Sequence, residues 1–134
     1  METVNQIEYN GALYDVQDAE AQKSLVYSQS ETDTGKIWID GKKIYRKVIQ
    51  LPAIAKDKEY NLDLSNLNAS TYVQINGFVQ VEKDNFQPLL NSNRISASYN
   101  IFIAIYKKIL RVVTGTSREM LNGFIILEYT KTTN

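Results

Sequence analysis

The fold is decided by the stretch Lys36-Ile37-Trp38-Ile39-Asp40-Gly41-Lys42-Lys43-Ile44-Tyr45-Arg46-Lys47-Val48-Ile49, which holds two strand-forming runs around a turn. Ile, Trp, Tyr and Val favour strands, and the central Asp40-Gly41 pair tolerates the positive φ that a type I′ turn requires. The spacing therefore predicts a β-hairpin with Asp40 and Gly41 at its tip.

Strand signals continue after this hairpin. Residues 71–81 show the period-two pattern of a sheet with one face in the core, and Gly77, which interrupts it, predicts a bulge. The run 99–106 is apolar on both faces, which predicts a central strand covered on each side, or by a neighbouring subunit. Further strands are expected at 59–64, 86–90, 109–114 and 123–130. Short strands with frequent turns predict a mainly β fold, an antiparallel β-sandwich of jelly-roll type.

The first 35 residues differ in character from the rest. Residues 6–9 and 12–16 flank Asn10-Gly11, which predicts a small opening hairpin. Asp15 or Asp18 can cap a short helix that runs through Tyr27. Its apolar face is too small for the helix to be stable alone, so the helix needs a partner, and docking onto its own domain is one candidate. The polar segment 28–35 reads as a linker. We therefore predict a neck segment over residues 1–35 and a β-sandwich head domain over residues 36–134.

The composition excludes several classes of function. Fifteen basic and fifteen acidic residues cancel, so no large field draws in nucleic acid, and charge repulsion opposes self-association only weakly. Cysteine and histidine are absent, which excludes disulfides, imidazole-based triads and ordinary zinc sites. The longest apolar run, residues 101–106, is far shorter than the ~18 residues of a membrane span. We expect a protein made in the cytoplasm that does not insert into a membrane.

Neither an enzymatic reaction nor a cofactor or metal is expected. The available carboxylates lie in turn-like or alternating polar positions, where solvation explains them: Asp57, Glu59, Asp63, Asp84 and Glu119. Asn61, Asp63 and Ser65 alternate, so they could present oxygens to Ca²⁺ from one face of a strand. The glycine and the bidentate glutamate of a calcium loop are missing. Gly35-Lys36 lacks the rest of a phosphate-binding loop.

Basic and aromatic residues supply the remaining candidates. Two basic sets suit sheet edges better than anion sites: Lys42, Lys43, Arg46 and Lys47, and then Lys107, Lys108 and Arg111. Of the nine tyrosines, Tyr45, Tyr106 and Tyr129 lie inside strand patterns and are interpreted as structural, like Trp38. Tyr72, Phe86 and Tyr99 lie beside turns, and aromatic rings stack on sugars and proteins. We select these three as candidate ligand-binding residues.

Two segments resemble a known family. The pattern W-I-D-G-K-x-I-Y-R-K-x-I at residues 38–49 and the ending E-Y-T-K-T-T at residues 128–133 resemble the C-terminal head module of tail-fibre and receptor-binding proteins of tailed phages or prophages of gut bacteria. The opening, residues 10–21, is similar to a phage-fibre segment in which a strand leads into a helix. Lys43 departs from the family pattern, which commonly has proline there, and residues 51–98 match no pattern.

The resemblance implies a component of the virion, in the phage tail, that adsorbs without catalysis to a bacterial surface receptor, a polysaccharide or a protein. Such modules are generally homotrimers, in which the N-terminal helix would join a bundle about a threefold axis and multivalency would add avidity. Other phage tail proteins are expected partners. Two alternatives stay open: a structural or assembly protein of the tail or baseplate that never contacts the receptor, and a glycan depolymerase with paired carboxylates.

Overall fold

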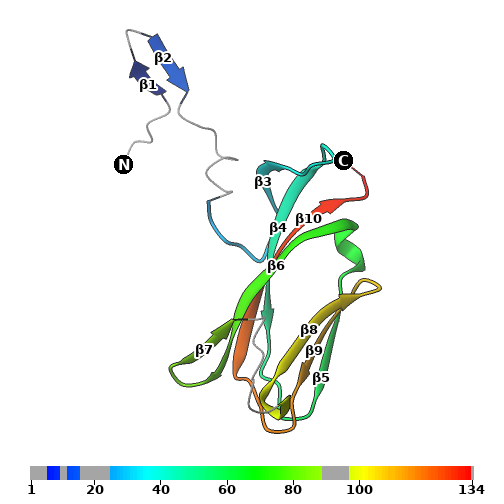
Figure 1. Ribbon diagram of the computed structural model, residues 1–134. Helices are drawn as coiled ribbons and strands as arrows, with labels where there is room; N and C mark the ends of the chain where they lie inside the picture. Colours follow the sequence, from blue (N-terminus) through cyan, green and yellow to red (C-terminus); the bar gives the residue numbers. More distant parts are fainter. Residues whose placement is uncertain (1–5, 10–11, 16–24, 89–96, 134) are drawn as a thin grey trace.

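The computed structural model describes residues 6–9, 12–15, 25–88 and 97–133, and it is mainly β (Figure 1). β1 (Gln6–Tyr9) and β2 (Ala12–Asp15) pair antiparallel, which confirms the opening hairpin. The predicted N-terminal helix falls mostly outside the described residues; residues 25–27, its expected end, form a turn and a bend. No helix in the described part of the chain is long and apolar enough to cross a membrane.

Residues 32–131 build two antiparallel sheets, which confirms the predicted β-sandwich class (Figure 1). The larger sheet has the order β3 (Thr32–Ile37), β4 (Lys43–Leu51), β10 (Asn122–Lys131), β6 (Ala69–Glu82), β7 (Asn85–Pro88). The smaller sheet has the order β5 (Glu59–Asp63), β9 (Ile109–Thr114), β8 (Ile101–Tyr106). Two short 3₁₀ helices, η1 (Ser65–Leu67) and η2 (Ala97–Tyr99), lie in the connections. The jelly-roll detail stays a prediction.

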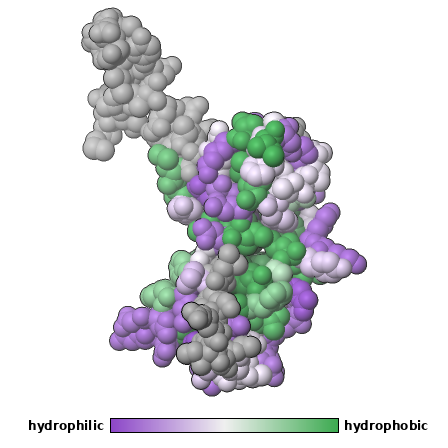
Figure 2. All heavy atoms as spheres, viewed as in Figure 1, coloured by the Kyte–Doolittle hydropathy of each residue, from purple (hydrophilic) through white to green (hydrophobic). Residues whose placement is uncertain are grey.

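The core lies between the facing surfaces of the two sheets. β10 contributes Ile125, Leu127 and Tyr129, which are fully buried, and β9 contributes Leu110 and Val112 from the opposite side. Leu67 of η1 and Met120 complete the core beyond the two ends of β10. Apolar side chains also gather at the surface over the middle of the molecule in Figure 2, and a second apolar group lies at its upper end. Burying each large apolar side chain contributes about 1.5–3 kcal/mol, so this shared interior holds the sheets together.

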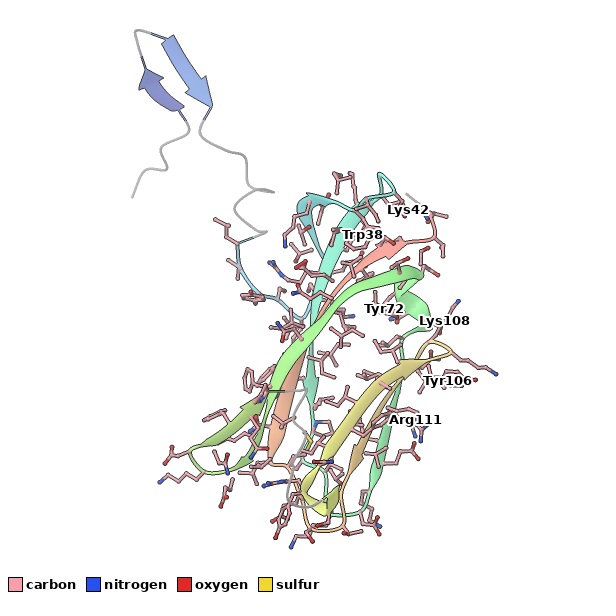
Figure 3. All side chains as sticks on the ribbon, viewed as in Figure 1. Trp38, Lys42, Tyr72, Tyr106, Lys108 and Arg111 are labelled. Carbon is pink, nitrogen blue, oxygen red and sulfur yellow. The ribbon has the colours of Figure 1, made fainter. Side chains whose placement is uncertain are left out.

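The hairpin of β3 and β4 forms as predicted, but its turn differs. The amide N–H of Gly41 donates to the carbonyl of Trp38 (2.9 Å), and Trp38 N–H donates to Lys42 O (2.8 Å), which closes a three-residue connection. Only Gly41 has positive φ (87°); Asp40 does not, so the type I′ prediction is wrong. Asp40 instead accepts the Lys42 N–H through its side chain (3.0 Å), the pattern of a turn followed by a glycine bulge. Trp38 and Lys42 are labelled at this end of the molecule in Figure 3.

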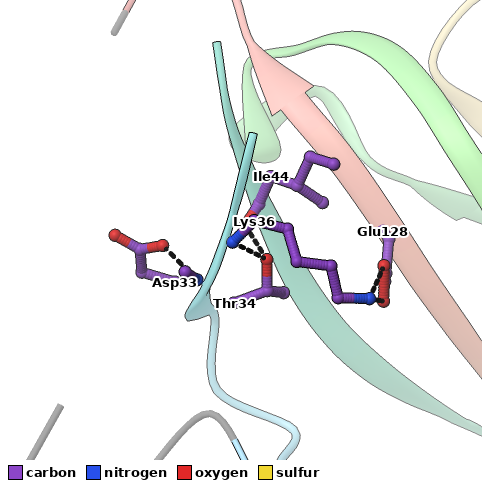
Figure 4. A network of polar contacts seen from close by, with 6 residues as sticks. Asp33, Thr34, Lys36, Ile44 and Glu128 are labelled. Atoms are coloured by element: carbon purple, nitrogen blue, oxygen red, sulfur yellow. Dashed lines mark hydrogen bonds and ion pairs between the residues drawn. The ribbon is translucent and has the colours of Figure 1, made fainter. Parts of the chain in front are cut away.

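β3 begins at Thr32, so part of the segment interpreted as a linker is a strand of the larger sheet. Between the pairs Asp33 with Tyr45 and Ile37 with Lys43 the register shifts, and residues 34–36 lie opposite one residue of β4. The Thr34 hydroxyl donates to the carbonyl of Ile44 (2.7 Å) inside this bulge (Figure 4). The bulged strand is therefore held by side chains as well as by its backbone.

The predicted bulge at Gly77 is wrong in position. Gly77 pairs regularly with Ile125, while the register of β6 shifts at Val73 and Ser70. Gly77 is required because its φ is +132° and because a Cβ there would lie 2.0 Å from the carbonyl oxygen of Phe124. Of the predicted core positions on this strand, Val79 and Val81 are buried, whereas Ile75 is 40% exposed.

The strand over residues 101–106 is an edge strand, which corrects the prediction of a central one. Within the described part of the chain β8 pairs with β9 alone. Phe102 (56% exposed) and Tyr106 (62% exposed) face outward, so the tyrosine predicted as structural lies at the surface. The turn that joins these strands has positive φ at both Lys107 (50°) and Lys108 (66°), as in a type I′ turn (Figure 3). A Lys-Lys pair rarely adopts this conformation, which explains why the sequence gives no signal for it.

Replacement of Gly77 by alanine should destabilise the protein by about 3 kcal/mol or more, because the new Cβ meets the Phe124 carbonyl at a backbone conformation that L-residues avoid. Urea unfolding at neutral pH measures the change. Gln74→Ala, an exposed position on the same strand, is the control and should change the free energy of unfolding by no more than about 0.5 kcal/mol. Equal stability of the two variants would contradict the close approach.

Candidate binding surface

The outer face of the larger sheet, turned away from the core, carries a group of apolar side chains at its centre. Side chains alternate along β10, so Phe124 and Ile126 point to the face opposite Ile125 and Leu127. Phe124 pairs in register with Phe78 of β6, and Ile126 pairs with Val48 of β4. Three adjacent strands therefore place apolar side chains side by side on a surface that the smaller sheet does not cover.

An aromatic cluster occupies this face. The ring centroids of Phe78 and Phe124 are 5.6 Å apart and tilted by 43°, and those of Phe78 and Phe86 are 5.9 Å apart in an edge-to-face arrangement. Phe86 lies on β7 and is 59% exposed, while Phe78 is 36% exposed. Such ring pairs stabilise one another by about 0.5–1.5 kcal/mol beyond the area they bury, which fixes their orientation while leaving ring surface accessible.

The chain before β3 forms one wall of this surface. The carbonyl of Ser28 accepts the Val48 N–H (2.9 Å), so the backbone of this segment is bonded to β4. Arg46, only 8% exposed, donates through Nη2 to the carbonyl of Val26 (3.2 Å) and places its guanidinium 4.6 Å from the centre of the Tyr27 ring. The cation–π contact and the hydrogen bond together orient Tyr27.

These elements enclose a cavity of about 510 Å³ that opens to solvent, a size typical of small-ligand sites. The cavity is lined by Tyr27, Ser28, Gln29, Val48, Phe78, Phe124 and Ile126. The rings and the aliphatic side chains offer apolar contact, while the Ser28 hydroxyl and the Gln29 amide offer hydrogen bonds. The cavity thus suits a ligand with one apolar face and polar groups at its edge.

The three candidate ligand-binding residues do not come together. Phe86 belongs to the aromatic cluster just described. Tyr72 faces the inside, where its ring lies 6.1 Å from that of Tyr129 and its buried hydroxyl has no partner among the described residues. Tyr99 is 42% exposed in η2, with the Arg118 guanidinium 5.2 Å from its ring. The aromatic surface is completed instead by residues that the sequence analysis did not select, Phe78 and Phe124.

Some of the acidic and basic candidates have partners within the fold, as the following contacts show. Asp57, Glu59, Asp63, Asp84 and Glu119 are all exposed, as the sequence analysis interprets them. Glu59 forms an ion pair with Arg111 on the outer face of the smaller sheet, where Figure 3 labels that arginine. The described residues contain no group of three or more acidic side chains able to hold a metal ion.

The first basic set does not line a free edge. Lys43 lies near Asp33 (3.6 Å) and Lys42 donates to the carbonyl of Lys131 (3.3 Å). Arg46 is buried, since β4 lies between β3 and β10 in the sheet, so the edge interpretation is wrong for it. In the second set, Lys107 and Lys108 form the turn between β8 and β9.

Three tyrosines form a structural cluster on the inner side of the larger sheet. Tyr129 is completely buried and contacts the rings of Tyr45 and Tyr72, which confirms the structural role expected for Tyr45 and Tyr129. The Tyr129 hydroxyl donates to Glu31, whose carboxylate also pairs with Lys131. Burial raises the pKa of Tyr129 far above its ordinary value, and the hydrogen bond to Glu31 raises it further.

Comparison of the chain with protein-family models, with curated protein sequences and with solved structures finds no match. The geometry of the surface and the sequence resemblance are therefore the grounds for a functional proposal.

The free energy of unfolding should fall as the pH rises above about 10, the ordinary tyrosine pKa, because the unfolded chain then ionises a Tyr129 that the fold keeps neutral. Tyr129→Phe should cost about 1 kcal/mol near neutral pH, where the hydrogen bond to Glu31 is lost. Above pH 10 the difference from the wild type should shrink by about 1.4 kcal/mol per pH unit.

Urea unfolding at a series of pH values measures both effects. Tyr106→Phe, which removes the hydroxyl of an exposed tyrosine, is the matched control and should leave the pH dependence as in the wild type. If the free energies of unfolding of Tyr129→Phe and of the wild type depend on pH in parallel, burial and Glu31 do not raise the pKa of the Tyr129 hydroxyl.

Proposed function

We propose that this protein is a receptor-binding component of a phage or prophage tail fibre, which adsorbs without catalysis to a bacterial surface polysaccharide. The observation that carries the proposal is the solvent-open cavity of Tyr27, Phe78 and Phe124 on the outer face of the larger sheet. The resemblance of residues 38–49 and 128–133 to the head module of such fibres supports the same function.

The cavity favours a receptor reader over a purely structural protein. A reader needs rigid aromatic surface that stays accessible, and the rings of Phe78 and Phe86 meet this requirement because each is fixed by a neighbouring ring and yet exposed. The less polar face of a sugar ring would stack on Phe78 and Phe124. The amide of Gln29 and the hydroxyl of Ser28 would bond the hydroxyls at the edge of the sugar.

Single cavities of this kind bind weakly, and the proposal therefore includes a homotrimer in which three copies engage one polymer. Linked sites raise the effective concentration of the second and third contacts, so avidity can exceed single-site affinity by about 10²–10⁴. The protein would act in the virion, beside other tail proteins.

One observation favours the alternative, a structural or assembly protein of the tail or baseplate. Among the described residues β8 has no partner strand on one side, and its exposed Phe102 and Tyr106 lie on the outer face of the smaller sheet with Ile109 of β9. Edges of this type pair with strands of other chains. In this alternative the smaller sheet, and not the aromatic cavity, carries the function.

Phe78→Ala should weaken adsorption to receptive cells by about tenfold per site, because truncating a stacked aromatic anchor costs about 1–2 kcal/mol. Fluorescently labelled protein is incubated with a panel of gut bacteria and bound protein is measured by flow cytometry. Circular dichroism and the unfolding midpoint are recorded first, since Phe78 also packs on Phe86 and Phe124.

Phe102→Ala removes an equally aromatic and exposed side chain from the other sheet and should leave adsorption unchanged. Loss of adsorption in the folded Phe102→Ala variant, with Phe78→Ala unaffected, would move the function to the smaller sheet. Adsorption to no strain, by a wild-type protein shown to be folded, would contradict the proposal and favour the assembly role.

A further inference from the structure

A second cavity, of about 340 Å³, lies beside the second half of β4, where this strand meets β5 and η1. Its lining is more polar than that of the aromatic cavity. Gln29 and Val48 line both cavities, so the two sites are neighbours separated by this segment and strand. The polar groups that the second cavity has and the aromatic cavity lacks come from Lys47, Gln50, Tyr60, Asp63 and Asn66.

Lys47 is the unusual member of this lining. It pairs in register with the fully buried Leu127, and its neighbours on the same face of β4, Tyr45 and Ile49, both belong to the core or pack against it. The lysine is partly buried, yet its ammonium group forms no hydrogen bond or ion pair with any residue among those described. Lys47 lines the cavity without a partner among the described residues, and a bound anion would supply one.

The one acidic residue of the lining does not supply that anion. Asp63 accepts the Ser65 N–H at 2.8 Å, and this hydrogen bond, together with the charge of Lys108, lowers the pKa of its carboxyl group. Lys47 lies in no ion pair with it. Asp63 thus has a hydrogen-bond partner of its own, and Lys47, which has none among the described residues, is left for a ligand.

The uncharged groups around Lys47 suit a sugar ring. The side-chain amides of Gln29 and Gln50 contact one another at 3.5 Å, a long hydrogen bond that a ligand hydroxyl can replace. Asn66 is exposed at the rim. Tyr60 and Leu62 of β5 are partly buried and provide an apolar wall. The amides can bond sugar hydroxyls, the aromatic and aliphatic wall can pack on the sugar ring, and the lysine can pair with a carboxylate. Together these groups match an acidic monosaccharide.

We propose that this second cavity binds an acidic sugar unit, such as a uronic acid, with the Lys47 ammonium paired to the sugar carboxylate. The inference rests on the proposed function, since it names the class of polysaccharide that would be read. Because Gln29 and Val48 border both cavities, adjoining units of one polymer would occupy the aromatic cavity and the Lys47 cavity together. The preferred receptor is accordingly an acidic polysaccharide.

The test is an NMR titration of ¹⁵N-labelled full-length protein with D-glucuronate, D-glucose and inorganic phosphate as separate probes. Glucuronate should shift the backbone amides around Lys47 and Asn66, with a dissociation constant in the millimolar range. Glucose should bind about tenfold more weakly or not at all, since a charge-assisted bond to the carboxylate is lost. Phosphate distinguishes a site for any anion from a site for an acidic sugar.

Lys47→Gln should weaken glucuronate binding by about tenfold and abolish the preference over glucose. Lys43→Gln removes the same charge from the same strand and should leave binding unchanged, because Lys43 lies near Asp33 and outside the cavity. The inference is overturned if glucuronate does not bind, if glucose or phosphate binds as tightly, or if Lys47→Gln has no effect.

The two proposals fail in different ways. Adsorption that depends on Phe78 but not on Lys47 would retain the receptor-binding function and reject the acidic sugar. Glucuronate binding that depends on Lys47, in a protein that adsorbs to no cell, would retain the sugar site and reject the role as an adhesion protein.

Discussion

The structure depends on the pairing of β10 with a partner strand on each side. Its backbone is bonded to β4 and to β6, and its alternating side chains divide the molecule into a core and an outer surface. Ile125, Leu127 and Tyr129 build the first, whereas Phe124 and Ile126 build the second. Since the period is two, a slip of one residue would exchange the two sets. The same register therefore sets both stability and the candidate site.

Much of the architecture is readable from the sequence because it rests on local signals. Alternation and turn residues indicate the hairpin of β3 and β4, the opening hairpin and the sandwich class. The turn at Lys107 and Lys108 is not readable, because neither residue prefers positive φ. A glycine inside a strand pattern, as at Gly77, is visible in the sequence. Its cause is a tertiary contact with the Phe124 carbonyl, which the sequence does not show. Local sequence patterns therefore predict backbone conformation well, but they predict poorly which distant segments pack closely together.

The candidate site was harder to predict, since it unites segments far apart in the chain. Phe78 and Phe124 read as ordinary strand residues until pairing places them side by side. Lys47 reads as one member of a basic run, and only its register opposite Leu127 shows that it faces inward. β3 pairs with the first half of β4 alone, from Lys43 to Arg46. The second half of β4 borders both cavities, which share Gln29 and Val48.

The position of β10 also constrains the order in which the chain can fold. β4 and β6 are not neighbours in the sheet, because β10 lies between them, and β10 follows both in the sequence. During synthesis the ribosome releases β4 and β6 well before the strand that joins them, so each waits with an unpaired side. Contacts between such distant segments fold slowly. Until β10 has been synthesised, the sides of β4 and β6 that it will cover are therefore open to incorrect pairing.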